Sequence, residues 1–306
     1  MEILTHPNSL PASRRHKHRY TALAASVLGN CMQWSGVQSY LLRRPAIHLI
    51  YLHHTPDFAW LERLLLDLSR DFDFIDHDEA VSRIRSGKEG KPAISFSFDD
   101  GFASCKPAVK VLEQFGTRGL IYICPGLVGM DDPGVARFFG GQQPEGVLDW
   151  DSIIAIKSAG HLVGSHTVTH RNLAKLSASE LTEELETSRQ IILSKLGICE
   201  HFAWPFGRMQ FFSYQAFQCA VMAGYKSIAS GIRGSHRVAS DGMLCRHVIH
   251  PGQTAESLKR FLALSLAGLD GHTRSRKWIT ASNAHNLLKV QQNCMATFDQ
   301  QNTSNE

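Results

Sequence analysis

Two adjacent aspartates, Asp99 and Asp100, are the first residues whose types and position suggest chemistry. They follow the stretch from Ile94 to Phe98, in which apolar and small polar residues alternate as they do in a strand. Neighbouring carboxylates repel each other, and a cation or a proton relieves the repulsion by giving the two groups different roles. Gly101 allows the chain to turn sharply behind them. On its own, this pattern fits an N-cap at a strand-to-helix turn equally well.

Two histidines four residues apart, His166 and His170, change that balance. On one helical turn, or on a tight helical loop, their imidazoles point the same way. Two neutral imidazoles and one carboxylate bind a divalent metal and leave positions open for water and substrate. The histidine pair alone is more typical of two surface side chains. Together with Asp99 and Asp100 it predicts a metal site, in which one aspartate is a ligand and the other a base acting on a water whose pKa the cation lowers.

The elements that must position these residues alternate between strands and helices. We expect strands at 47–52, 72–75, 94–98, 119–124, 161–165, 202–204, 225–229 and 246–249. We expect helices at 58–70, 78–86, 105–115, 150–158, 177–196, 213–223 and 254–267, and a long surface loop without periodicity at 125–147. Such alternation predicts a parallel sheet with helices outside, either open and doubly wound or closed into a barrel. In both folds, binding and active sites lie at the carboxyl ends of the strands. The aspartates and histidines described above follow strands and so belong to that end.

The composition is that of an ordinary globular protein of 306 residues with a net charge of +4. A chain of this length forms one large domain or two small ones. The small net charge gives no reason to expect a nucleic-acid partner. Seven scattered cysteines, none of them in a CxxC pair, argue for reduced thiols and against a disulfide framework or a zinc ribbon.

The segment 1–46 begins basic and continues amphipathic. Its apolar run, 20–28, resembles that of a signal peptide but is short and lacks a small-x-small cleavage site. We interpret 20–42 as an amphipathic helix that lies on a membrane surface or packs on the domain, with packing favoured. The expected location is cytoplasmic or peripheral to the membrane, with export left open. At the other end, 271–306 is expected to hold a helix at 281–297 and a polar tail.

Three spaced motifs resemble those of the polysaccharide deacetylases, carbohydrate esterase family 4, which carry the nodulation-type deacetylase domain. They are Phe98-Asp99-Asp100-Gly101, Ser165-His166-Thr167-Val168-Thr169-His170 and Phe202-Ala203-Trp204-Pro205-Phe206-Gly207. The resemblance covers residues 47–265 and places a domain at 47–270. It implies an α/β fold, a distorted (β/α)7-type barrel with parallel strands, and metal-dependent hydrolysis of an N-acetyl group on an amino sugar. It also implies that Asp100, His166 and His170 hold the metal, usually zinc, and that Asp99 is the general base.

The sequence departs from the commonest family pattern at two places. Ala203 stands where that pattern has an arginine that orients the base, and Phe206 stands where it has a tyrosine. An apolar shelf remains for an acetyl methyl or a sugar face, made of Trp204, Pro205, Phe206 and Gly207. The Asp-x-x-Asp-Trp motif is also missing after Tyr225. These losses resemble the branch that contains the biofilm poly-N-acetylglucosamine deacetylases, where the chain order is permuted and a Tyr-His near the first strand supplies the catalytic acid.

Three histidines compete for the role of the acid. Leu52-His53 matches the Tyr-His of that branch, so the resemblance favours His53. His54 is the neighbour that could displace it, and His250 takes the role under the unpermuted pattern. Under the branch resemblance the segment around His250 is a plain strand, so we rank it lower.

The function implied is a metal-dependent hydrolase that removes N-acetyl groups from an amino-sugar polysaccharide, oligosaccharide or glycoconjugate. The expected cofactor is a divalent metal, with zinc favoured. Two alternatives stay open. One is a related amide hydrolase acting on a formyl group or a small amide. The other is a barrel that only binds glycans, but this predicts a lost ligand or base, and none is lost.

Overall fold

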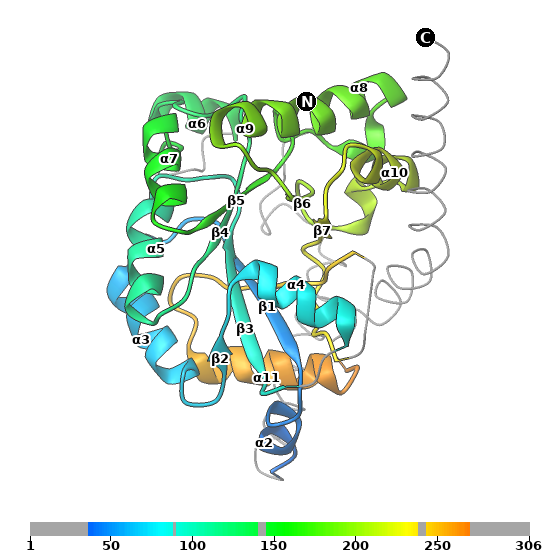
Figure 1. Cartoon of the computed structure of the whole chain (residues 1–306). Helices are drawn as coiled ribbons and strands as arrows, with labels where there is room; N and C mark the ends of the chain where they lie inside the picture. Colours follow the sequence, from blue (N-terminus) through cyan, green and yellow to red (C-terminus); the bar gives the residue numbers. More distant parts are fainter. Residues whose placement is uncertain (1–35, 88–89, 140–144, 238–242, 270–306) are drawn as a thin grey trace, which may run out of the picture.

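The computed structural model describes residues 36–87, 90–139, 145–237 and 243–269 (Figure 1). Most of the predicted helix at 20–42 and all of that at 281–297 lie outside these ranges. Of the first, the structure describes α2 (Val37–Leu42). None of the helices in the described ranges combines the length and the apolar character needed to cross a bilayer.

One sheet organises the described part of the chain, and every strand pairing in it is parallel. Its strands are β1 (Ile47–Leu52), β2 (Asp73–Phe74), β3 (Ala93–Phe98), β4 (Leu120–Ile123), β5 (Leu162–Ser165), β6 (His201–Ala203), β7 (Ser227–Ala229) and β8 (His247–Val248). The order is β7-β6-β5-β4-β3-β1-β8, with β2 beside β3. Leu244 pairs with Ala229 of β7 just before β8 pairs with β1. The segment leading into β8 therefore links the two edges, and the predicted distorted barrel with parallel strands is confirmed.

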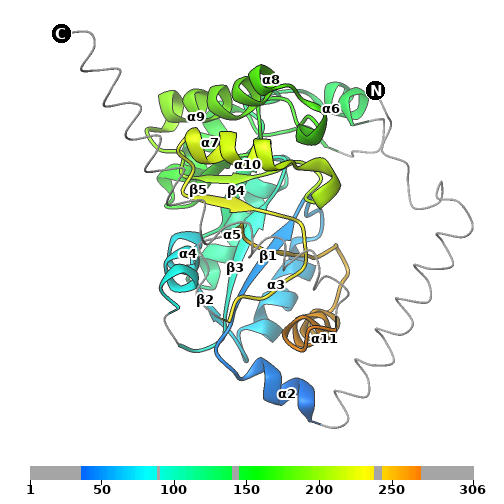
Figure 2. The same cartoon turned by 90° about the vertical axis from the view of Figure 1, so that its right-hand side faces the viewer.

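Helices cover the outside of this curled sheet (Figures 1 and 2). They are α3 (Phe58–Leu68), α4 (His77–Ser86), α5 (Cys105–Gln114), α6 (Asp132–Phe138), α7 (Trp150–Ser158), α8 (Ala178–Thr182), α9 (Ser188–Leu196), α10 (Tyr214–Met222) and α11 (Ala255–Leu266). Side chains cap most of them, and Ser177 and Glu180 form a reciprocal capping box. The two faces of the sheet have separate cores. Ile94, Phe96 and Phe98 of β3 pack in the larger core, while Ala93 packs in the smaller core with α4.

Two helical features differ from the sequence-based expectation. The segment 125–147 was predicted to be a loop, but it contains the helix α6. This helix is too short to show a periodic pattern in the sequence. Asp131 caps its N-terminus, because its side chain accepts a hydrogen bond from the N–H of Gly134. The predicted single helix at 177–196 is interrupted by a π-helical turn, Glu183–Thr187, between α8 and α9. Such turns are rare and are frequently found at functional sites, and this one contacts the predicted metal loop.

Candidate active site

The carboxyl ends of β3, β5 and β6 bring the predicted residues together through an unusual backbone. In the described ranges, the non-glycine residues with positive φ are Asp100 (69°), Thr167 (70°), His170 (55°) and Phe206 (63°). All of them lie in the three loops that follow these strands. A left-handed backbone costs a side-chain-bearing residue free energy, and it persists where the surrounding structure holds it. The backbone strain of the described chain is therefore concentrated where the sequence predicts chemistry.

Asp100, His166 and His170 converge on one point. Oδ1 of Asp100 lies 3.5 Å from Nε2 of His166 and 3.2 Å from Nε2 of His170, and the donor atoms of all three lie within 4.8 Å of one another. Asp100 is 6% exposed and His166 is 2% exposed. Oδ1 of Asp100 is buried without a hydrogen-bond donor in the described ranges. A buried carboxylate oxygen left in this state fits a bound cation, and imidazole nitrogen and carboxylate oxygen are the ligands that zinc takes.

The protonation of His166 suits a metal ligand. Its Nδ1 lies 2.7 Å from the carbonyl oxygen of Ala203, so Nδ1 carries the proton and Nε2 keeps its lone pair toward Asp100. Burial lowers the pKa of His166 to about 4, although the carboxylates of Asp99 and Asp100 oppose this. The imidazole is therefore neutral near pH 7, as a metal ligand must be.

The loop that carries both histidines is fixed by a buried carboxylate on the π-helical turn. Glu184 is 4% exposed and accepts two hydrogen bonds from Thr169, one from the backbone N–H at 2.9 Å and one from the hydroxyl. Ser188 forms a 2.7 Å hydrogen bond with Ser165 at the start of the same loop. The π-helical turn and the first residue of α9 thus direct two polar side chains at the segment 165–170. In the sequence, this region shows only an ordinary helical pattern.

Asp99 is held by an arginine that the sequence analysis did not select. Arg246 is fully buried and donates to both carboxylate oxygens of Asp99, from Nη1 at 2.7 Å and from Nη2 at 2.8 Å. It also donates from Nε to the carbonyl of Ser230 at 2.7 Å, and its guanidinium lies 4.2 Å from the ring centroid of Tyr51. The carboxylate of Asp99 therefore has a fixed orientation. In the commonest family pattern the arginine that orients the base stands at position 203, where this chain has alanine. Here Arg246, directly before β8, makes that contact with Asp99 instead.

The charge of Asp99 follows from these contacts. Burial by itself would raise the pKa of its carboxyl, but the charges of Arg246 and His166, the hydrogen bonds from Arg246 and the charge of His53 together bring the pKa below its ordinary value. Asp99 is thus ionised at neutral pH and can accept a proton. For Asp100, burial likewise opposes ionisation, and the neighbouring histidines outweigh it, so its pKa is also lowered.

The three candidate acids occupy different surroundings. His53 is exposed, its ring lies 5.5 Å from that of Tyr51, and its charge acts on both Asp99 and Asp100. His54 points Nδ1 toward Glu145, 3.4 Å away, and Glu145 is in turn bound to Ser104. His250 is exposed as a residue. Its pKa is lowered, first by the partial burial of its ring and then by the charge of nearby His53. Of the three, His53 is the one whose charge is felt by both aspartates.

Comparison with known proteins finds a family match over part of the chain. Residues 86–228 match the family model described as Polysaccharide deacetylase. This stretch holds Asp99, Asp100, His166 and His170. A search of curated proteins finds no match to this chain.

Solved structures of several deacetylases are similar to this one. They include the deacetylase PplD of Streptococcus pyogenes, at 18% identity over 72% of this chain and 99% of that chain, with a TM-score of 0.58. IcaB of Ammonifex degensii is similar at 16% identity over 72% of this chain and 97% of that chain, with a TM-score of 0.62. The BpsB deacetylase domain of Bordetella bronchiseptica follows at 17% identity, 67% and 96% coverage and a TM-score of 0.51. At these identities the similarity concerns the fold.

The stretch after β6, which the sequence predicts to be an apolar shelf for a substrate, divides into buried and accessible parts. Trp204 is fully buried and stacks on Phe212, with the ring centroids 4.3 Å apart. Trp204 is therefore part of the core and has no surface that a substrate could contact. The prediction that it belongs to the substrate shelf was wrong. Pro205 is buried as well, whereas Phe206 is partly exposed and its ring lies 4.7 Å from that of His170. Phe206 is thus the residue of the shelf that lies beside the candidate metal-binding residues, next to His170.

Gly207 has a structural reason to be glycine. A Cβ at this position would lie 2.6 Å from backbone atoms of Gly231, and its φ is +63°. Gly231 donates its N–H to the carbonyl oxygen of Gly207 at 2.8 Å. The close approach ties the loop after β6 to the segment that follows β7 and leads toward Arg246. Gly207 thus shapes the site without offering a side chain to a substrate.

Proposed function

We propose that this chain is a member of the polysaccharide deacetylase family and a metal-dependent hydrolase that removes N-acetyl groups from an amino-sugar polysaccharide, oligosaccharide or glycoconjugate. One observation carries the proposal: Asp99, ionised and hydrogen-bonded to Arg246, lies beside the buried Asp100 and His166 and the partly buried His170. This is a base next to a set of metal ligands. A glycan-binding barrel without activity would have no use for an arginine that orients the base.

The metal that these ligands fit best is a divalent cation, and we propose zinc. When bound, it supplies a Lewis acid that polarises the amide carbonyl and lowers the pKa of a water. Asp99 takes a proton from the attacking water, and Arg246 keeps both oxygens of Asp99 in place while this happens. We further propose that the backbone N–H that follows Asp100 helps to stabilise the oxyanion.

Departure of the amine requires a proton, because an amide anion is too poor a leaving group. We propose that His53 supplies it, since its charge acts on both aspartates and its position matches the biofilm poly-N-acetylglucosamine branch. The loss of the family arginine at 203 and its replacement by Arg246 from the segment before β8 also favour that branch. Phe206, beside His170, is suited to contact with the acetyl methyl.

The test is acetate release from a panel of N-acetylated glycans. The panel should hold poly-N-acetylglucosamine oligomers, chitin oligomers and a glycolipid, each with and without chelator. We expect release that stops on chelation and returns with zinc, and an Asp99→Asn variant that keeps its metal but loses on the order of 10²–10⁴-fold in rate. Formate from a formylated amine, or ammonia from a small amide, with no acetate from glycans would favour the related amide hydrolase. If the wild-type chain holds its full metal content but hydrolyses none of these glycans and amides, the glycan-binding alternative would be favoured.

A further inference from the structure

Tyr51, near the carboxyl end of β1, contacts two side chains of the candidate active site that come from different parts of the chain. One of them is His53, two residues further on. Side chains two residues apart along a strand point to the same face of the sheet, and the rings of Tyr51 and His53 lie 5.5 Å apart in an edge contact. Tyr51 is only 8% exposed, whereas His53 is exposed. A buried ring thus supports an accessible imidazole.

The other side chain is that of Arg246, directly before β8. Its guanidinium carbon lies over the ring of Tyr51, 4.2 Å from the centroid, and it lies 5.2 Å from the ring centroid of Tyr122 on β4. At such distances a guanidinium and an aromatic ring attract each other, more strongly in a buried site than at the surface. The N–H groups of the same guanidinium bind Asp99 and the carbonyl of Ser230. Hydrogen bonds and two aromatic rings therefore restrain Arg246 together.

Tyr51 is itself confined at both its backbone and its hydroxyl end. Its carbonyl accepts a hydrogen bond from the N–H of Ile249 at 3.0 Å, and β1 pairs with both β3 and β8. Gly231 leaves room for the hydroxyl, because a Cβ at that position would lie 2.6 Å from the oxygen of Tyr51. Burial raises the pKa of Tyr51 to about 12, although the charge of Arg246 opposes this. Tyr51 is therefore a neutral ring with little freedom to move.

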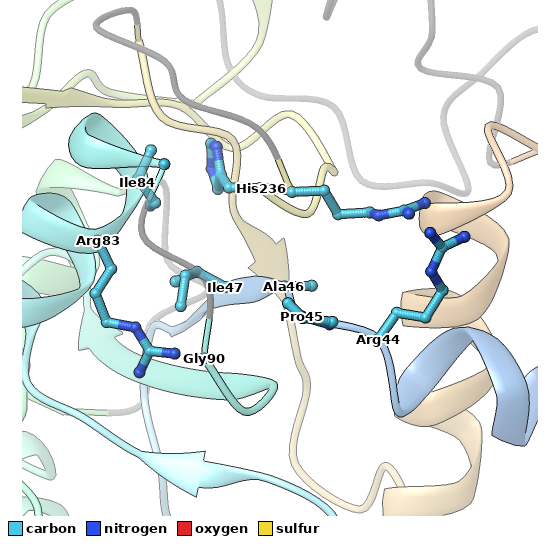
Figure 3. Close-up of a pocket in the computed structure, with 10 residues that line it drawn as sticks. Arg44, Pro45, Ala46, Ile47, Arg83, Ile84, Gly90 and His236 are labelled. Carbon is cyan, nitrogen blue, oxygen red and sulfur yellow. The ribbon is translucent and has the colours of Figure 1, made fainter.

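The opposite end of β1 offers a comparison. A cavity of about 100 Å³ lies there, and Arg44, Arg83 and Gly90 are among the residues that line it. Figure 3 shows the guanidinium of Arg83 beside Gly90, with Arg44 on the far side of residues 45–47. Arg83 donates to the carbonyl oxygen of Lys91 at 2.8 Å. The arginines at that end are thus held separately, whereas the arginine at the carboxyl end is in contact with a buried carboxylate and with aromatic rings of the candidate active site.

We propose that Tyr51 is a positioning residue for two groups, because its ring holds Arg246, and through it Asp99, and also sets the position of His53. This inference rests on the proposed function, in which Asp99 is the base and His53 the acid. The base takes a proton from water and the acid gives one to the amine of the same amide, so the rate depends on how the two are placed relative to each other. One ring in contact with both Arg246 and His53 fixes that placement.

Two substitutions at Tyr51 separate the ring from the hydroxyl. Tyr51→Phe keeps the ring and should turn over at nearly the wild-type rate. Tyr51→Leu removes the ring and should lower kcat on the order of tenfold, with the metal content unchanged. The matched control is Phe217→Leu, which removes a ring that is 2% exposed in α10, outside the candidate active site. It should lower the melting temperature and leave kcat as in wild type. An equal loss of kcat in Tyr51→Phe and Tyr51→Leu would contradict a role of the ring.

Double-mutant cycles test whether Tyr51 acts through its two neighbours. His53→Ala should lower kcat by a smaller factor in the Tyr51→Leu background than in wild type, because the imidazole is already displaced there. Arg246→Lys should do the same, for the same reason. Additive effects in both cycles would overturn the inference and make Tyr51 a residue of the core alone.

Nuclear magnetic resonance of the full-length, zinc-loaded chain tests the contacts without turnover. The guanidinium N–H signals of Arg246 and the ring signals of His53 are assigned by their loss in Arg246→Lys and His53→Ala. In Tyr51→Leu we expect faster exchange of the Arg246 protons with water and shifted His53 signals, and in Tyr51→Phe and Phe217→Leu the wild-type spectrum. Unchanged signals in Tyr51→Leu would overturn the inference even in an active deacetylase. Changed signals in a chain that hydrolyses no glycan would count against the proposed function and not against the hold of Tyr51 on the two side chains.

Discussion

The two ends of the barrel each hold a cluster of carboxylates and imidazoles with donor atoms within 4.8 Å of one another. At the carboxyl end these are Asp100, His166 and His170. At the amino end they are Asp78, Glu200 and His201. The two clusters therefore have similar residue types and similar distances between their donor atoms. Neither property shows which of the two is the better candidate for a metal site.

The two clusters differ in whether the atoms that could bind a metal already have hydrogen-bond or ion-pair partners within the protein. His201 uses both ring nitrogens, Nδ1 with Ser227 at 2.9 Å and Nε2 with Asp78 at 3.0 Å. Asp78 has a 53% exposed side chain, and Glu200 pairs with Lys226. At the carboxyl end, Asp100 is buried and its Oδ1 lacks a donor in the part of the chain that the structure describes. The comparison teaches that burial with unsatisfied lone pairs, rather than proximity, distinguishes a candidate metal site.

The largest expected effect tests this difference directly. His166→Ala should remove most of the bound metal and all measurable deacetylation, because it deletes one of three ligands. His201→Ala should keep about one metal ion per chain, because its nitrogens are engaged by protein groups. Elemental analysis of both variants, purified alike, measures this. Metal retained by His166→Ala and lost by His201→Ala would reverse the assignment of the two clusters.

The next effect sharpens the assignment of roles at the carboxyl end. His53→Ala should lower turnover on the order of 10²–10⁴-fold with the metal content unchanged, because a general acid would be missing. The high-pH limb of the rate profile, which requires the acid to be protonated, should disappear with it. His250→Ala is the matched control and should do little, with His54→Ala between them. A lost limb in His250→Ala, together with wild-type behaviour of His53→Ala, would restore the unpermuted arrangement.

Arg246→Gln should reduce activity on the order of 10²–10³-fold, because Asp99 loses both hydrogen bonds that orient it. Leaving Asp99 buried and unpaired should also destabilise the fold by about 3–5 kcal/mol. Since Arg246 lowers the pKa of Asp99 and the base acts when ionised, the low-pH limb should move to higher pH. Arg246→Lys keeps the charge and should recover stability more than rate. An unmoved limb in a folded variant would argue against Asp99 as the base.

Glu184→Gln tests how the loop of the metal ligands is held. Removing the charge that accepts two hydrogen bonds from Thr169 should weaken metal affinity about 10–100-fold, as is typical for groups that support ligands. Glu183→Gln, one residue earlier and exposed, removes the same charge and should bind metal as wild type. Competition with a chromophoric chelator measures both. Equal affinity of the two variants would leave Glu184 with no part in the metal site.

The smallest effect concerns the buried histidines outside the metal site. Burial lowers the pKa of His48 to about 3 and that of His77 well below its usual value, with neighbouring histidines adding to it. The unfolded chain then binds protons below pH 6.5 that the folded chain does not. Their contribution to stability is thus full above pH 6.5 and declines as pH falls, by about 1.4 kcal/mol per pH unit for each histidine. Urea unfolding at pH 7, 6 and 5 should show a shallower decline for His48→Asn/His77→Asn, and parallel declines would contradict this.

Local patterns in the sequence were enough for much of the fold and for selecting the residues of the candidate metal site. The strand periodicity placed β1, β3 and β5 within one or two residues, and the residues after those strands include His53, Asp99, Asp100 and His166. Since the strands are parallel, their carboxyl ends meet at one edge, and residues distant in the chain become neighbours. Where the pattern was too short or irregular, as in α6 and in the π-helical turn, the prediction was wrong, because neither feature has a periodic signal of its own.

The sequence by itself determined the residue types that could bind a metal, and the strand ends at which they stand. Only the tertiary structure decided that Arg246 orients Asp99 and that Glu184 holds the loop of His166 and His170. It also decided that Trp204 belongs to the core and not to the substrate shelf. The physical reason is that these roles depend on contacts between segments far apart in the chain. Arg246 is 147 residues from Asp99, and no local pattern reports a hydrogen bond made at that separation.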